Sequence, residues 1–333
     1  MTDFIPRPAV PLTSDVRFES NLDNYPESVT DDENYTFTPA PMPNTMIWPR
    51  DNIYSALPYS HQPLGDGPWI RILRLSPGMD RDPIKVSLQP VNLDDAVSQY
   101  DALSYVWGSD FIAHAIDVDG CSFAIRDNLF KFLASIRDPE ESLNLWADAI
   151  CIDQKNTKEK NHQVQQMGRI YKGSRATRLW LGQGDKNVDS FLHSIAESQY
   201  KPPNESTVLK PSQRSELSSE QNDKIAFSRG LHWILYNPYW TRLWIVQEVI
   251  LSPNVRVYVS RTGYSWETFA QFCKSGAAEM QRYYRNEIAD KLSQSTIISL
   301  DRQRREKSVR NFVDLIKISV PVSASTFGIE FLD

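Results

Sequence analysis

Cysteine is scarce in this sequence, and long apolar runs are missing from it. Three cysteines are spread over 333 residues, with no CxxC pair and no Cys/His spacing that fits a metal. This pattern argues against a disulfide scaffold and against a structural zinc site. No stretch approaches the roughly 18 apolar residues of a membrane span, and the start, MTDFIPRPAV, does not read as a signal peptide. We therefore expect a cytoplasmic protein with no membrane span and no metal.

The motifs of several common enzyme classes are also absent. The sequence contains no GxSxG, Walker or GxGxxG motif, and its histidines show no ligand spacing. Cys151 lies within an apolar run, where a free cysteine usually packs as a small hydrophobic side chain. A cysteine-protease or metalloenzyme reading is therefore weak.

Excess charge of one sign is confined to one segment. Residues 1–45 hold eight acidic side chains, two arginines and seven of the 21 prolines, and they carry the whole formal net charge of −6. This composition predicts a disordered acidic leader. The remaining residues balance to zero, which argues against a groove that binds nucleic acid through net positive potential.

Hydrophobic patterns predict alternating strands and helices. Asp119-Gly120, flanked by alternating apolar residues, predicts a β-hairpin. Helical periodicity follows Asp127 and also runs from Asn156 to Gly173. The expected strands cover residues 70–75, 84–91, 102–106, 143–153 and 177–182. Strand, helix, strand, helix, strand is typical of an α/β protein with a parallel sheet covered on both faces.

The second half of the chain continues this alternation around a polar stretch. A mobile insertion is expected at residues 201–223, which are rich in Ser, Pro and Glu. One continuous helix is predicted over residues 240–251 and a strand over 255–260. We expect a core domain over residues 46–262 and a helical extension over 263–333.

Candidate ligand-binding residues follow the strands, because ligands of open α/β sheets bind outside the carboxyl ends of the strands. Ser104 to Asp110, Asp153 to Asn156 and Gly182 to Asp185 occupy such positions. Loops are polar in any case, so these positions alone do not define a site. Asp148 lies inside the apolar run 143–153, where an unpaired carboxylate is costly. It either satisfies a structural hydrogen bond or belongs to the site.

A second candidate lies on the predicted helix 240–251. Trp240, Trp244 and Glu248 are four residues apart and would form one column on that helix. The column is either a core stripe that ends in a solvated glutamate or an apolar, aromatic-lined cleft that holds a carboxylate. In a cleft, Glu248 would accept a hydrogen bond from a sugar hydroxyl or stabilise a developing cation.

Several ordered motifs resemble the heterokaryon incompatibility (HET) domain of filamentous fungi, over roughly residues 70–260. They are YDALSYVWGSD, NLWADAICIDQKN, QVQQMGRIYKGS, RLWLG and YWTRLWIVQEV. HET domains are in turn similar to the Toll/interleukin-receptor (TIR) fold. The resemblance implies a flavodoxin-like, TIR-like parallel sheet flanked by helices, with the hairpin at Asp119-Gly120 and the insertion before Asn237 as departures from it. The predicted core domain is then the HET domain.

TIR enzymes carry a glutamate on a helix after a tryptophan, and this pattern is similar to Trp244-Ile-Val-Gln-Glu248. The resemblance makes Glu248 the catalytic candidate. Trp107 or Trp244 would stack on a ring, while Ser104 and Gly108 would line the loop. Asp153, which closes the expected strand 143–153, completes the set of expected nucleotide contacts.

The resemblance implies a cell-death effector of fungal non-self recognition. One mechanism is NAD glycohydrolysis, with NAD as a substrate, no resident cofactor and no metal. The alternative is a non-enzymatic module that signals by self-association or by recruiting an incompatibility partner protein. An acidic leader and a Ser/Pro-rich insertion would suit interaction surfaces equally well, so both alternatives stay open.

Overall fold

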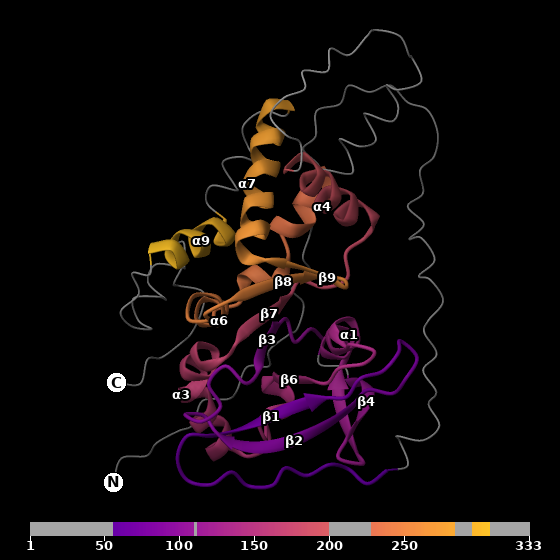
Figure 1. Ribbon diagram of the computed structural model, residues 1–333, viewed down its shortest axis with the longest axis vertical. Helices are drawn as coiled ribbons and strands as arrows, with labels where there is room; N and C mark the ends of the chain where they lie inside the picture. The colour runs from indigo at the N-terminus through magenta and orange to yellow at the C-terminus, as the bar shows by residue number, and fades with distance from the viewer. Residues whose placement is uncertain (1–55, 110–111, 200–227, 284–294, 307–333) are drawn as a thin grey trace, which may run out of the picture. The chain divides into compact units, whose positions relative to one another are not determined.

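The computed structural model describes residues 56–109, 112–199, 228–283 and 295–306. The predicted acidic leader (1–45) and the predicted insertion (201–223) lie outside these ranges. None of the helices within them combines the length and apolar character that crossing a bilayer requires. The described elements form one mixed sheet with helices packed against it (Figure 1).

Four parallel strands form the centre of this sheet. They are β3 (Asp101–Tyr105), β6 (Leu143–Trp146), β7 (Ala176–Trp180) and β8 (Val255–Val259), in the spatial order β6-β3-β7-β8. Numbered along the chain, this order is 2-1-3-4, which is the beginning of the flavodoxin-like order. All five residues of β3 are buried, as expected for a parallel strand covered on both faces. The predicted α/β class is confirmed.

Helices connect these parallel strands. The connecting helices are α1 (Asp127–Ile136), α3 (Thr157–Gly173) and α4 (Lys186–Gln199). The predicted cap of α3 is present, because the Asn156 side chain accepts a hydrogen bond of 3.1 Å from the Glu159 amide. The predicted apolar face of α1 is buried as well, including Leu129, Phe132 and Leu133. Local patterns therefore located both helices correctly.

Further strands widen the sheet on both sides, mostly by antiparallel pairing. They are β1 (Trp69–Leu75), β2 (Lys85–Asn92), β4 (Ile112–Val118), β5 (Cys121–Arg126) and β9 (Thr262–Ser265). The order over the described residues is β5-β4-β2-β1-β6-β3-β7-β8-β9, an open sheet and not a closed barrel. At the β4–β5 hairpin, Asp119 and Gly120 have φ of 51° and 81°, as a two-residue turn of this kind requires. The predicted hairpin is confirmed.

Two apolar clusters pack against the sheet, and neighbouring residues of β7 belong to different ones. Trp180 belongs to the first cluster and stacks on Phe132 of α1, with ring centroids 5.4 Å apart. Leu179 belongs to the second cluster, which includes Phe269 of α7 (Trp266–Tyr283). Successive side chains of a strand point to opposite faces, so β7 separates the two clusters. In Figure 1, α9 (Thr296–Glu306) lies beside α6 (Ile245–Ile250) and α7.

The predicted strand over residues 143–153 is too long. Strand β6 ends at Trp146, and the helical turn α2 (Asp148–Cys151) begins two residues later. The Asp148 carboxylate accepts a hydrogen bond of 2.8 Å from the Ala149 amide, which favours a helix start at this residue. The apolar residues that follow are buried as part of the turn, which is why the sequence pattern looked like a continuous strand.

The predicted continuous helix over residues 240–251 is also wrong. A 3₁₀ turn, η1 (Pro238–Thr241), comes first; Arg242 is extended, with ψ of 135°; and α6 begins at Ile245. Trp240 packs in the second apolar cluster, whereas Trp244 packs against the first. The two tryptophans therefore do not form one column with Glu248.

Candidate functional site

Polar side chains gather at the carboxyl end of β3. This strand is the first of the parallel set, with the second (β6) on one side and the third (β7) on the other. The chain therefore reverses its direction of winding at β3, and such a switch point is where open α/β sheets bind ligands. Ser104 and Tyr105 are the last two residues of β3, and Trp107 and Gly108 follow in the loop.

The Glu248 carboxylate is bound on both of its oxygens. Arg242 donates one hydrogen bond of 3.0 Å to each oxygen, in a bidentate ion pair. Ser104 donates a further hydrogen bond to Glu248 and shares another with the Tyr239 hydroxyl. Glu248 and Ser104 are each 1% exposed. The structure thus places two of the predicted site residues, Ser104 and Glu248, in direct contact.

The electrostatics of this cluster favour a charged Arg242 and a neutral Tyr239. Burial alone would lower the pKa of Arg242, but the neighbouring Glu248 raises it above its ordinary value. Burial and the Glu248 charge both raise the pKa of Tyr239. The guanidinium also lies 5.3 Å from the centre of the Tyr239 ring. In this conformation, Glu248 could reach a ligand only after the Arg242 side chain moves.

A second carboxylate, Asp148, lies at the carboxyl end of the adjacent strand. It accepts hydrogen bonds of 3.1 Å from the Tyr105 hydroxyl and 2.9 Å from the Trp107 indole. Asp148 is half-buried. Burial raises the pKa of its carboxyl; the hydrogen bond from Trp107 opposes this rise, and the charge of Glu248 adds to it. The site thus holds two carboxylates, the first neutralised by Arg242 and the second supported by neutral donors.

The loop after β3 is anchored by contacts from outside the two carboxylate clusters. The Asn128 amide donates a hydrogen bond to the carbonyl of Val106. Gly108 has φ of 75°, a conformation that favours glycine. The Arg126 guanidinium lies 5.0 Å from the centre of the Trp107 ring. Trp107 therefore contacts a cation on its ring and a carboxylate at its indole nitrogen.

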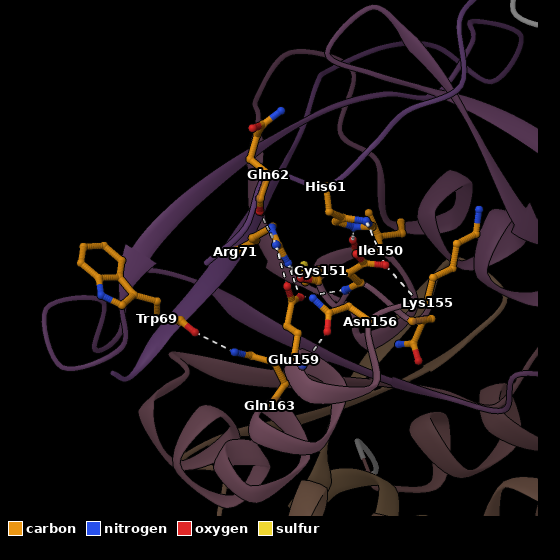
Figure 2. A network of polar contacts seen from close by, with 12 residues as sticks. His61, Gln62, Trp69, Arg71, Ile150, Cys151, Lys155, Asn156, Glu159 and Gln163 are labelled. Carbon is orange, nitrogen blue, oxygen red and sulfur yellow. Dashed lines mark hydrogen bonds and ion pairs between the residues drawn. The ribbon is translucent and has the colours of Figure 1, made fainter. Parts of the chain in front are cut away.

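The Asp153 amide is bonded to a different polar network. Figure 2 shows this network around Arg71. Arg71 is buried in β1 and donates hydrogen bonds of 2.6 and 3.0 Å to Glu159, and one of 2.9 Å to the Cys151 carbonyl. Glu159 in turn accepts a hydrogen bond of 2.8 Å from the Asp153 amide. His61 is 2.8 Å from the Ile150 carbonyl. This network holds the backbone of α2 and of the residues after it.

The predicted site residues are thus brought together only in part. Ser104 contacts Glu248, Trp107 contacts Asp148, and Gly108 lies in the same loop. Trp244 is half-buried at the N-cap of α6, and the Asp153 amide is bonded to Glu159 of the Arg71 network. In the described ranges, no three His, Cys, Asp or Glu side chains gather as metal ligands.

Sequence reasoning missed Arg242 and Tyr239, and it included Tyr105 only as a member of the range Ser104 to Asp110. On a continuous helix, residue 242 lies about 120° around the axis from residue 248, so the two side chains would point away from each other and a partnership was not visible. The break between η1 and α6 removes this obstacle. A signal was nevertheless present, because Asn237-Pro238 begins a short turn of its own and so indicates a boundary close to Arg242.

Fold and site together define a mixed α/β protein with a polar, two-carboxylate centre at the switch point of its parallel strands. The sequence model of the family described as Heterokaryon incompatibility protein (HET) matches residues 100–248. This match begins one residue before β3 and ends at Glu248. Residues 100–248 are therefore similar to the HET family, the family that the sequence motifs resemble.

A curated relative supports the same assignment. The protein "Heterokaryon incompatibility protein 6, OR allele" of Neurospora crassa is 28% identical over 188 residues. The alignment covers 46% of this chain and 28% of the relative, so the chain matches little more than a quarter of that protein's length. No solved structure matches the chain, and the similarity to the TIR fold stays a prediction.

Proposed function

We propose that this protein acts in fungal non-self recognition, as a heterokaryon incompatibility protein that causes cell death. The HET match over residues 100–248 and the name of the Neurospora relative support this role. The match includes β3, α2 and Glu248, and therefore the whole two-carboxylate centre. The activity of this centre is accordingly the activity to test.

The reaction that we propose is hydrolysis of the bond between nicotinamide and ribose in NAD. The observation that carries it is the hydrogen-bonded pair Ser104–Glu248 at the carboxyl end of β3. When the C–N bond breaks, nicotinamide leaves with the electron pair and the ribose becomes an oxocarbenium-like cation. Water then adds to this cation and releases a proton. A carboxylate held in a site with little water stabilises such a cation.

In this proposal, Glu248 faces the ribose once Arg242 has moved away from it. Trp107 and Trp244 would contact flat rings, while Ser104 and Gly108 would line the loop beside the ligand. Asp153 would contact the nucleotide from the residues that follow α2, where Glu159 holds its amide. NAD is the substrate, and the mechanism requires no metal.

A second function is favoured by the state of Glu248 itself. Its carboxylate is 1% exposed and receives donors from both Arg242 and Ser104, as a purely structural ion pair would. On this reading the domain signals without catalysis, through self-association or by recruiting a partner protein. In that case Ser104 connects β3 to α6 through Glu248, Arg242 neutralises the Glu248 carboxylate, and Arg242 does not move to admit a ligand.

The deciding experiment measures free nicotinamide after the purified full chain is incubated with NAD. We expect release by the wild type and a loss of about 10²- to 10³-fold in Glu248→Gln. Asp101→Asn is the matched control, because Asp101 is a buried carboxylate bonded to Arg175 and Arg178 at the opposite end of β3. This control should retain activity at a similar loss of thermal stability.

Two outcomes would contradict the enzymatic proposal. Unchanged release by a folded Glu248→Gln variant would remove Glu248 from the reaction. No release by the wild type, combined with Glu248→Gln chains that still kill the cells expressing them, would favour the non-enzymatic function. Light scattering of both chains in solution would then show whether self-association accompanies killing.

A further inference from the structure

Asp148 occupies a distinctive position in the topology of the sheet. It lies two residues after β6, and β6 is the second parallel strand along the chain, beside the first strand β3. In dinucleotide-binding α/β folds, an acidic residue that follows the glycine-rich turn by about 20 residues binds the ribose 2′-hydroxyl. This chain has no glycine-rich fingerprint, so the argument depends on the local geometry of Asp148.

That geometry leaves the carboxylate able to accept another hydrogen bond. Oδ1 accepts from Tyr105 and from the Ala149 amide, whereas Oδ2 accepts from Trp107. An ionised carboxylate oxygen has two lone-pair positions. Among the described residues, the donors to Asp148 therefore leave one position open on Oδ2. The residue is also half-buried, whereas Glu248 is 1% exposed, and among the described residues the hydrogen bonds to the Asp148 carboxylate come from neutral donors and not from a cation.

Asp148 is also held in place from three directions. Tyr105 and Trp107 fix its carboxylate from the β3 side. The Gln154 side chain donates a hydrogen bond of 2.8 Å to the backbone carbonyl of Asp148. Arg71 donates one of 2.9 Å to the carbonyl of Cys151, at the end of the same turn. A polar group fixed in this way loses little conformational freedom when a ligand binds.

We infer that Asp148 binds the 2′-hydroxyl of the adenosine ribose and determines which nucleotides the site accepts. The inference rests on the proposed function for the choice of a nucleotide ligand. A hydroxyl donates to the carboxylate, whereas a 2′-phosphate on the same ribose has no proton to donate and brings a like charge next to Asp148. The site therefore takes nucleotides with free ribose hydroxyls and rejects their 2′-phosphorylated counterparts.

The test compares two probes that lack nicotinamide and hence the bond proposed to be cleaved: ADP-ribose and ADP-ribose 2′-phosphate. Calorimetric titration of the full chain should show at least about tenfold tighter binding of ADP-ribose, the value of one charge-assisted hydrogen bond. In Asp148→Asn, ADP-ribose should bind about tenfold more weakly. The ratio of the dissociation constants of ADP-ribose 2′-phosphate and ADP-ribose should fall towards one. Asp148→Glu, which keeps the charge, should retain the preference, as should the control Asp101→Asn.

Trp107→Phe provides a second variant in case Asp148→Asn does not fold. It leaves the charge in place but removes the indole donor that orients Oδ2, so ADP-ribose affinity should fall while rejection of the 2′-phosphate persists. Equal preference in the wild type and Asp148→Asn would overturn the inference, as would a wild type that binds neither probe. Selective binding without nicotinamide release would overturn only the hydrolysis proposal. Release with unselective binding would overturn only the role of Asp148.

Discussion

At the scale of single residues, the ion pair between Glu248 and Arg242 dominates the site. The Glu248 side chain is almost fully buried, and the Arg242 side chain is 21% exposed. A buried ion pair gains little net stability over an apolar pair, but removing one partner leaves an uncompensated charge in a medium that solvates it poorly. The two residues are therefore expected to depend strongly on each other.

Arg242→Met should lower the free energy of unfolding by about 3–5 kcal/mol, because Glu248 then remains buried without its counter-charge. Urea denaturation of the purified chain measures this loss. The double variant Arg242→Met/Glu248→Gln should recover a large part of it, since no buried charge is left. A loss as large in the double variant as in the single one would mean that packing, and not charge, is responsible.

At the scale of elements, α2 is a turn of four residues that tertiary contacts hold in place. A turn of this length is not stable by itself, because helix nucleation is unfavourable. Its backbone is held by Arg71 at Cys151 and by His61 at Ile150, as Figure 2 shows. Glu159 connects these contacts to α3. Placement of Asp148 thus depends on α3, which follows it closely in the sequence, and on β1, which lies far before it.

The Arg71–Glu159 pair should make stability dependent on pH. Burial by itself would raise the pKa of Glu159, but the hydrogen bond from Arg71 lowers it below the ordinary value of 4.5. The ionised form therefore stabilises the fold above this value, and the contribution is lost as the pH falls through the lowered pKa. The difference in melting temperature between the wild type and Glu159→Gln should be constant near neutral pH and narrow in acid. If the difference in melting temperature stays the same down to the lowest pH measured, the Arg71–Glu159 pair is not the source of the pH dependence.

At the scale of the whole described structure, two apolar clusters share one sheet. Trp180 and Leu179 are adjacent in β7 and belong to different clusters, so neither cluster can lose its order without disturbing this strand. Ser104 and Glu248 add a polar contact between residues 144 positions apart. We therefore expect the described elements to unfold as one cooperative unit.

Substitutions on either side of β7 test this cooperativity. Phe132→Ala and Phe269→Ala each empty a buried position in one cluster and should cost about 3–5 kcal/mol. In both variants, aromatic circular dichroism and backbone circular dichroism should report the same single urea midpoint. Two separate midpoints, with only one displaced by each substitution, would show that the clusters unfold independently.

The sequence by itself determined those features that depend on neighbouring residues. Asp119-Gly120 specified a hairpin because few residue pairs adopt positive φ in succession. Asn156 specified the start of α3 because its side chain satisfies an amide only three residues away. The order of strands and helices, and the HET resemblance through motifs from YDALSYVWGSD to YWTRLWIVQEV, followed from patterns of the same short range.

Only the tertiary structure decided which partners the polar side chains found. Glu159 has capping-box spacing, yet its carboxylate binds Arg71, 88 residues away, because β1 places a buried guanidinium beside it. Arg242 reaches Glu248 because packing of Trp240 and Trp244 into different clusters breaks the helix between them. A buried charge binds whatever counter-charge the packed segments bring near, and that depends on the arrangement of distant elements, which local sequence patterns do not encode.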